Sequence, residues 1–385
     1  TAYGVASILA LVMNVDYLTA IVLLMGVTIA YDVLGGMRAV VVSDVVQMVL
    51  LIAAVLIALG DLAPSLAAQH VALAERTAPL LDDWGVTGSS DYGFWPMLFG
   101  GLFLYVAYYG FDQSQAQRLL SAGDDRALRR ILLLNGLLRF PLVLAYCVLG
   151  LGLAAYALEH PGFLSALPMT EQGDPNINLV FPYYVLEAFP AGLAGLAIVG
   201  LFAAAMSSLD SALNSLSAST LEDFLPTWAG RHSERDNFLL SKLLTLAWGG
   251  FAVAFSFFVE QIAGTVLEAI NKVGSLVFGP MLGLFLVALL MPAAGERRAL
   301  AGFVAGVAVN GYAWTMLPQL SWLWWNVLGC AVVLLFALTA LPRLARPVFA
   351  GLAGVRTVAR ALVAGALAML AILLILQSGS GVATG

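Results

Sequence analysis

A run of small and polar residues, AAAMSSLDSALNS at 203–215, interrupts an apolar stretch that extends from about residue 191 to residue 221. On a helix, four of its oxygen-bearing side chains would share one face, because they recur at spacings of three and four: Ser207, Asp210, Ser211 and Asn214. Several hydroxyl groups with one carboxylate supply hard oxygen ligands, which suit a small hard cation. A single negative charge matches a monovalent ion better than a divalent ion.

The structural alternative is that these side chains hydrogen-bond across a tight helix interface. Asp210 weighs against this alternative, because a carboxylate inside a membrane is costly and usually functional. A second acid, Asp44 in AVVVSDVVQ, also falls within an apolar segment. Asp44 could bind a cation, or it could be an acid near a helix N-terminus, where the helix dipole favours negative charge.

The chain is too hydrophobic for a soluble protein, because 61% of its 385 residues are hydrophobic and only 10% are charged. Its continuous apolar runs can cross a bilayer as helices and lack the alternation of a membrane β-barrel. We therefore expect an all-α polytopic membrane protein in contact with the lipid bilayer. Residues 178–189 are expected to form an interfacial helix. The predicted apolar segments are 2–14, 17–34, 40–62, 94–118, 127–157, 191–221, 237–258, 265–292, 299–317, 320–341 and 357–377.

The distribution of basic residues predicts the orientation of these segments. If a turn at 34–39 faces the cytoplasm and the spans alternate, 14 of the 17 lysine and arginine residues lie on the cytoplasmic side. Only Arg76 lies on the other side, and Arg139 and Lys272 fall within spans. Membrane proteins show this bias toward positive charge inside. The long loops at 63–93 and 158–190 would then face outward.

Other function classes find little support in the residues. Cys147 and Cys330 form no metal or redox motif, and the three histidines fall in connecting segments, where they do not suggest a metal site or an intramembrane enzyme. We find no basic stripe for nucleic acid and no glycine-rich phosphate loop. The chain begins with Thr1, and the segment 2–14 is short for a span. We interpret it as the end of a transmembrane helix that starts upstream, although an interfacial helix is the alternative.

Three segments resemble the sodium:solute symporter family. They are YDVLGGMRAVVVSDVVQ at 31–47, YYGFDQSQAQRLL at 108–120 and AAAMSSLDSALNSLSASTLEDF at 203–224. The first departs from the family pattern at Asp32 and Val42. The resemblance implies a leucine-transporter-like fold with a five-plus-five inverted repeat. About two to three of its first helices would be missing, so that 1–62 is the remainder of the first repeat. Residues 94–292 would form the second repeat, and 293–385 three accessory helices.

The resemblance also implies site residues. One sodium ion would bind the carbonyl of Ala204 and the hydroxyl groups of Ser207 and Ser208. A possible second sodium site would use Asp44, Asp210 and Ser211. The residues implied for the solute and its gate are Tyr105, Tyr108, Tyr109, Arg139 and Asn271. Tyr105 stands where sugar carriers have an amide, which argues against a sugar. Arg139 could bind a carboxylate of the solute, or it could pair with a helix carbonyl or with Asn135.

The implied function is sodium-coupled symport of a small polar organic solute across the cytoplasmic membrane by alternating access. The coupling ion is sodium, and no other cofactor, no nucleic-acid partner and no enzymatic reaction is expected. The alternative is a symporter-like membrane sensor that binds a solute and reports it to another protein.

Overall fold

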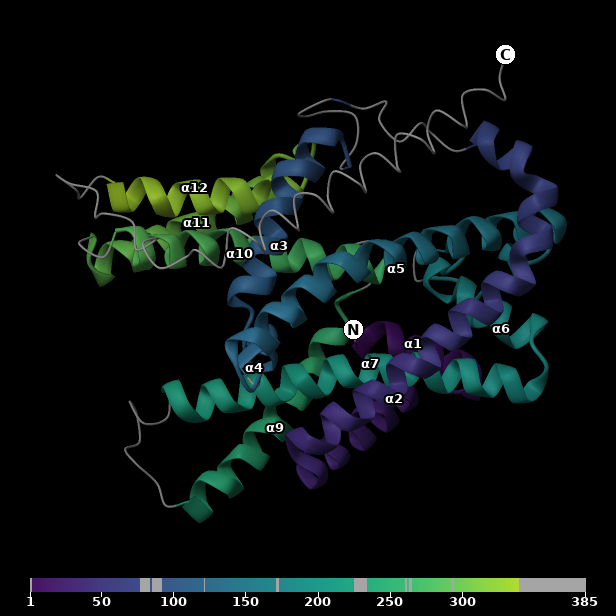
Figure 1. Ribbon diagram of the computed structural model, residues 1–385, viewed down its shortest axis with the longest axis horizontal. Helices are drawn as coiled ribbons and strands as arrows, with labels where there is room; N and C mark the ends of the chain where they lie inside the picture. The colour runs from purple at the N-terminus through teal and green to yellow at the C-terminus, as the bar shows by residue number, and fades with distance from the viewer. Residues whose placement is uncertain are drawn as a thin grey trace. The chain divides into compact units, whose positions relative to one another are not determined.

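The computed structural model describes residues 2–76, 84, 92–120, 122–170, 173–224, 234–259, 262, 265–291 and 294–338 (Figure 1). Side chains at 31–44, 76, 117, 118, 120, 234, 235, 290 and 338 are outside this description. The regular elements in the described part are helices, and Met169 and Pro175 form an isolated β-bridge. The chain divides into two compact units, Thr1–Arg76 with Leu142–Ala269, and Thr77–Pro141 with Ile270–Gly385.

Six helices of the described part are long and apolar enough to cross a membrane: Val45–Glu75, Asp125–Glu159, Ala191–Phe224, Asp236–Ser256, Val266–Leu289 and Glu296–Met316. A seventh span is possible if the bent pair Ala2–Met13 and Tyr17–Ala30 counts as one. The chain is therefore a multi-pass membrane protein, as its composition predicted. The predicted segment 357–377 lies outside the described residues.

Helices α1 (Ala2–Met13) and α2 (Tyr17–Arg76) begin the first unit and meet at a sharp bend of 114°. At the bend, Asn14 adopts a positive φ of 52°, which asparagine tolerates better than most residues. Asp16 then accepts hydrogen bonds from the backbone N–H of Thr19 at 2.9 Å and from its hydroxyl at 2.7 Å. The first of these bonds satisfies a backbone donor that the first turn of α2 would otherwise leave open.

The predicted turn at 34–39 was wrong, because these residues are helical and belong to α2. Nevertheless, α2 cannot be a straight rod. Met25 belongs to a core cluster with Leu209, whereas Ala54 belongs to one with Ala197. Met25 and Ala54 would be about 44 Å apart along the axis of a straight α2. The residues in their clusters, Leu209 and Ala197, are only about 18 Å apart along the axis of the helix at 191–219. The direction of α2 must therefore change between Met25 and Ala54.

The same helix also extends further than predicted, because residues 63–76 were expected to form a loop. Their sequence contains five alanines and two leucines, which favour helix. Pro64 inside this stretch removes the N–H that would bond the carbonyl of Gly60. The helix is held by packing of Leu62 and Leu73, which are 2% and 8% exposed.

Three more helices complete the first unit: α6 (Val180–Ala188), α7 (Ala191–Ser219) and α9 (Glu234–Ser256). Helix α5 (Asp125–Glu159) contributes its part after Pro141. A π-helical turn, Thr220–Phe224, extends α7. The short α6 matches the predicted non-spanning helix. It is anchored by Tyr184, which is fully buried and donates a hydrogen bond to the carboxylate of Asp61. Burial raises the pKa of Tyr184, and this hydrogen bond raises it further.

The second unit contains α3 (Gly101–Phe111), preceded by a π-helical turn at Pro96–Gly100, and α4 (Gln113–Leu120). It also contains α10 (Val266–Leu290) from Ile270 onward, α11 (Glu296–Met316) and α12 (Leu323–Leu338). The predicted continuous segment 94–118 was wrong, because the helix breaks at Asp112. Asp112 has extended backbone, and its Oδ1 accepts from the N–H groups of Ser114 at 3.0 Å and Gln115 at 3.2 Å. It thus starts α4 as an N-cap.

Candidate functional site

The polar stretch predicted at 203–215 lies on α7, within the first unit. The hydroxyl of Ser207 donates to the carbonyl of Ala204 at 3.0 Å. One turn later, the hydroxyl of Ser211 donates to the carbonyl of Ser207 at 2.8 Å. Each serine therefore uses its proton on its own helix, and an oxygen that donates in this way can still accept a hydrogen bond or bind a cation through its lone pairs.

Burial divides this stretch into two faces. Asp210 is 1% exposed and Ser211 is 7% exposed, so both lie inside the unit. Ser207 is half-buried, whereas Ser208 is exposed on the same face as Ala212. The structure thus separates Ser208 from Asp210, although they are neighbours in the motif.

Packing explains which face is inside. Leu209 and Leu213 are also buried, in a cluster with Ile21, Leu24 and Met25 of α2. The interior side of α7 is therefore both apolar and polar, and Asp210 lies beside a hydrophobic core. A carboxylate in such a place requires a compensating partner. Asp44 is part of α2, but its side chain lies outside the described residues.

Ala204 also borders an apolar cavity of about 570 Å³. Its walls come from α1, α2, α5, α6 and α7, and they include Leu51, Val55, Tyr146 and Leu149. Ala204 thus lies next to open space, although the lining is mostly hydrocarbon.

Four of the predicted solute residues, three tyrosines and an arginine, lie together in the second unit. The guanidinium carbon of Arg139 lies 5.2 Å from the ring centre of Tyr105 and 5.4 Å from that of Tyr109. Arg139 also donates a hydrogen bond to the hydroxyl of Tyr109. The two tyrosines, one turn apart on α3, have nearly parallel rings with centres 6.3 Å apart. We call Tyr105, Tyr109 and Arg139 the arginine–tyrosine cluster.

The segment YYGFDQSQ supports this cluster. Asp112 ends α3 and starts α4, which lets Gln115 donate to the hydroxyl of Tyr108 at 2.8 Å. The ring of Tyr108 meets the ring of Tyr109 edge-on at 5.1 Å. Tyr108 also contacts Phe278 of α10 at 6.3 Å between ring centres. Asn271, half-buried near the start of α10, lies two turns before Phe278.

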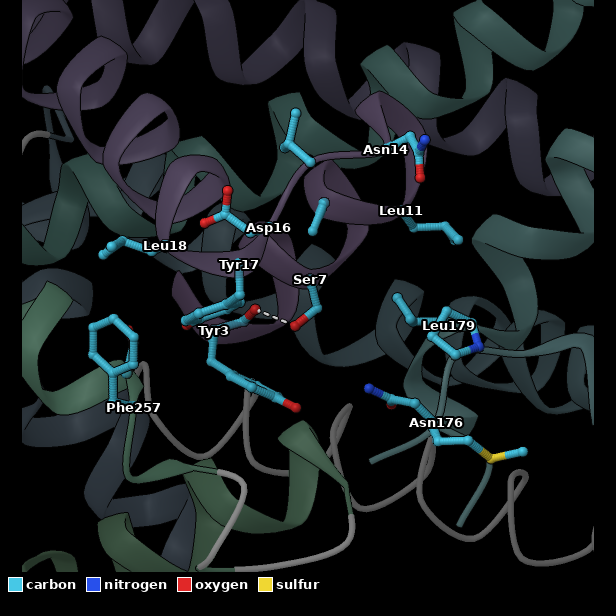
Figure 2. Close-up of a pocket in the computed structure, with 15 residues that line it drawn as sticks. Tyr3, Ser7, Leu11, Asn14, Asp16, Tyr17, Leu18, Asn176, Leu179 and Phe257 are labelled. Carbon is cyan, nitrogen blue, oxygen red and sulfur yellow. Dashed lines mark hydrogen bonds between the residues drawn. The ribbon is translucent and has the colours of Figure 1, made fainter. Parts of the chain in front are cut away.

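A further pocket of about 580 Å³ was not predicted from the sequence (Figure 2). Three connecting segments form it together with α1: the bend between α1 and α2, residues 168–179, and the end of α9. The rings of Tyr3, Tyr17 and Phe257 are in sequential contact along one wall, with centres 5.8 and 5.4 Å apart. Figure 2 shows the hydroxyl of Tyr3 and the amide of Asn176 directed toward each other, and the carboxylate of Asp16 directed away from them.

No local signal could have identified this pocket, because its segments are far apart in the sequence and carry no motif. The loop side chain Asn176 is only 7% exposed, and its Oδ1 accepts from the backbone N–H of Asn178 at 3.2 Å. The pocket has Asp16 as its one charged lining residue among those described, so it offers negative rather than positive charge.

Comparisons with known proteins identify the family of the chain. The sequence model of the sodium:solute symporter family matches residues 1–306. A sodium-dependent multivitamin transporter from Oryctolagus cuniculus is 30% identical over 290 residues, which is 72% of this chain and 43% of that protein. A sodium-coupled monocarboxylate transporter 2 from Bos taurus is 30% identical over 285 residues, 73% of this chain and 45% of that protein.

The fold is similar to that of a sodium-coupled sialic acid symporter solved in a substrate-bound, outward-open state. The TM-score is 0.72 at 22% identity, and the match covers 90% of this chain and 71% of that chain. The chain spans less than half the length of the two curated relatives that it matches.

Proposed function

Because this chain belongs to the sodium:solute symporter family, we propose that it carries out sodium-coupled symport of a small polar organic solute by alternating access. The family and the matched relatives are transporters. The observation that carries the proposal is the polar stretch of α7, where Asp210 is buried at 1% exposure within a membrane-spanning helix. Sodium that enters down its gradient supplies about 2.3 kcal/mol per charge and per 100 mV.

The proposed sodium ligands are the carbonyl of Ala204 and the hydroxyl groups of Ser207 and Ser208. Their spacing of three and four residues places them on one helical turn. The hydrogen bond from Ser207 to Ala204 supports this assignment, because it draws two of the three oxygens together at 3.0 Å. Asp44, Asp210 and Ser211 are proposed as a second sodium site. Ser211 is tied to Ser207 by its hydrogen bond at 2.8 Å, which links the two sets.

The solute is proposed to bind at Tyr105, Tyr108, Tyr109, Arg139 and Asn271. The contacts of Arg139 with two tyrosines support this assignment, since they group three of the five residues. The alternative of a solute sensor would also use such a site, but it would bind the solute without accumulating it.

Uptake into proteoliposomes tests the proposal. We expect a sodium gradient to drive solute accumulation and a potassium gradient to fail. The Ser208→Ala variant should need a several-fold higher sodium concentration for half-maximal uptake, because it lacks one ligand. Ser165→Ala is the matched control, since this exposed serine lies in a connecting segment and bonds the carbonyl of Gly162. Unchanged sodium dependence in Ser208→Ala would reject this ligand, and binding without accumulation would favour the sensor.

A further inference from the structure

We propose that the solute is an organic anion and that its carboxylate binds Arg139 in the arginine–tyrosine cluster. This inference rests on the proposed function, because it names the chemical class that the symporter would carry. It also goes further than the sequence, which left open whether Arg139 binds a carboxylate or pairs within its own helix.

The position of Arg139 demands an explanation. It lies in α5, a 35-residue helix that is long and apolar enough to span the membrane. The arginine is 14 residues from the start of that helix at Asp125, or about 21 Å along its axis. Its side chain is exposed within its unit, so a ligand can reach it. At such a depth in a bilayer, a guanidinium is costly unless it meets a partner or lines a polar path.

The described contacts of Arg139 do not neutralise its charge. It bonds the hydroxyl of Tyr109 and lies over the rings of Tyr105 and Tyr109. Among the described residues, no carboxylate forms an ion pair with it. A guanidinium has five N–H donors in a planar fork, and one bond to a phenol leaves most of them available. Ring faces orient the guanidinium plane and lower its energy without removing its positive charge.

The remaining geometry suits an anion. The guanidinium fork matches a carboxylate in a bidentate pair, which is among the strongest hydrogen-bonded interactions in proteins. The hydroxyl of Tyr109 accepts from Arg139, so its own proton can be donated to the same ligand. Tyr105 is 49% exposed, and its ring can contact the organic part of the solute.

The same features disfavour other solutes. A cation would meet the charge of Arg139, and the cluster contains no acid to offset that repulsion. A neutral solute would leave the guanidinium without a counter-charge, which is expensive away from water. A bound solute would cover Arg139 and desolvate the charge pair, and truncating one partner of such a pair costs affinity on the order of 100-fold. We therefore expect acids to be preferred over their amides by roughly this factor. One matched relative is by name a monocarboxylate transporter, which agrees with this class.

The test uses matched acid and amide pairs as probes: lactate with lactamide, nicotinate with nicotinamide, and benzoate with benzamide. Binding to the purified protein in sodium is measured by calorimetry, and uptake is measured in proteoliposomes. We expect the acid of at least one pair to bind about 100-fold more tightly than its amide. In the Arg139→Gln variant this preference should vanish, and in Arg139→Lys, which keeps the charge but lacks the fork, it should be intermediate.

Arg130→Gln is the control, because this exposed arginine lies in the first turns of the same helix and outside the cluster. Its preference for acids should equal that of the wild type. If Arg139→Gln fails to fold, Tyr109→Phe replaces it, since this change removes only the hydroxyl that Arg139 bonds. Tyr109→Phe should weaken acid binding several-fold and leave amide binding unchanged.

The results separate this inference from the proposed function. If sodium drives uptake of amides as well as acids, or if Arg139→Gln keeps the acid preference, the inference is wrong and sodium symport stands. If acids bind through Arg139 but sodium drives no uptake, the anion site stands and the proposed function is wrong. If neither member of any pair binds the folded protein, the inference is also overturned.

Discussion

Asp210 is the residue whose surroundings impose the strictest chemical requirement. Its side chain is 1% exposed, and Leu209 and Leu213 beside it belong to the hydrophobic core. A charged carboxylate there needs a counter-charge or strong hydrogen bonds, whereas an amide of the same size is easier to bury. A bound sodium ion would supply the counter-charge, and this leads to a measurable difference between sodium and potassium.

We predict that sodium, but not potassium, raises the thermal unfolding temperature of the detergent-solubilised protein. At a sodium concentration of about 100 times the dissociation constant, one site stabilises the folded state by about 2.7 kcal/mol. In Asp210→Asn this sodium effect should shrink markedly, although the variant should fold and unfold at a similar temperature in potassium. Asp174→Asn, in an exposed loop, is the control and should respond like the wild type. An undiminished sodium effect in Asp210→Asn would exclude this carboxylate as a ligand.

Among the elements, α10 combines a proline with an unusual set of partners. Pro280 lies inside α10 and has no N–H for the carbonyl of Leu276. The side-chain amide of Asn310, on α11, donates to that carbonyl at 3.1 Å and to the carbonyl of Ser275 at 3.2 Å. From α12, the amide of Asn326 donates to the hydroxyl of Ser275 at 2.9 Å. Two neighbouring helices therefore supply hydrogen-bond donors near the point where Pro280 interrupts the backbone hydrogen bonds of α10.

Replacing Asn310 by leucine should therefore destabilise the protein, because the carbonyl of Leu276 then loses the side-chain amide that donates to it. We expect a loss of about 1–3 kcal/mol, measured by chemical unfolding. Pro280→Ala restores an N–H in α10 that can bond the same carbonyl. In the double variant, the loss caused by Asn310→Leu should then be smaller than in the wild-type background. Strict additivity of the two changes would show that Asn310 does not replace the missing donor.

Close helix contacts in the same unit depend on glycine residues, which have no side chain. A methyl group added at Gly279 would lie 2.3 Å from the backbone oxygen of Asn326, so α10 and α12 could not approach as they do. We predict that Gly279→Ala lowers the unfolding temperature severely. Gly311→Ala is the matched control on α11, because nothing lies within 4 Å of its added methyl group. This control should be neutral, or more stable by up to about 1 kcal/mol, since alanine favours helix over glycine. Equal behaviour of the two variants would contradict the packing argument.

At the scale of the whole molecule, charge and topology lead to one prediction about orientation. The predicted topology assigns 14 of the 17 basic residues to one side of the membrane, and we expect that side to face the cytoplasm. The same assignment places three segments on the outer side: the bend at Asn14–Asp16, the loop 168–179 and the end of α9. In the first unit these segments meet around the pocket of Figure 2, which is consistent with a common side of the membrane.

Cysteine labelling tests this orientation in a background in which Cys147 and Cys330 are replaced by alanine. His160→Cys, at an exposed position after α5, should react with a membrane-impermeant maleimide in right-side-out vesicles. Arg129→Cys, exposed near the start of α5, should react only after the vesicles are permeabilised. The reverse pattern would show that the predicted orientation is inverted.

The sequence by itself determined the class of the molecule and the order of most helices. Hydropathy and length predicted the membrane spans, and three motifs predicted the symporter family and fold, which the comparisons confirm. These properties depend on composition and on spacing along the chain, which are local. For the same reason, the sequence could predict that Ser207, Asp210 and Ser211 share a helical stripe.

Only the tertiary structure decided which face of each helix is inside. Asp210 is buried and Ser208 is exposed because α2 packs against one side of α7, and no residue of α7 encodes that choice. Likewise, Arg139 meets Tyr105 and Tyr109 across 30 or more residues of sequence, through the packing of α5 beside α3. Helical periodicity specifies a face, but the burial of that face depends on neighbours that are distant in the chain.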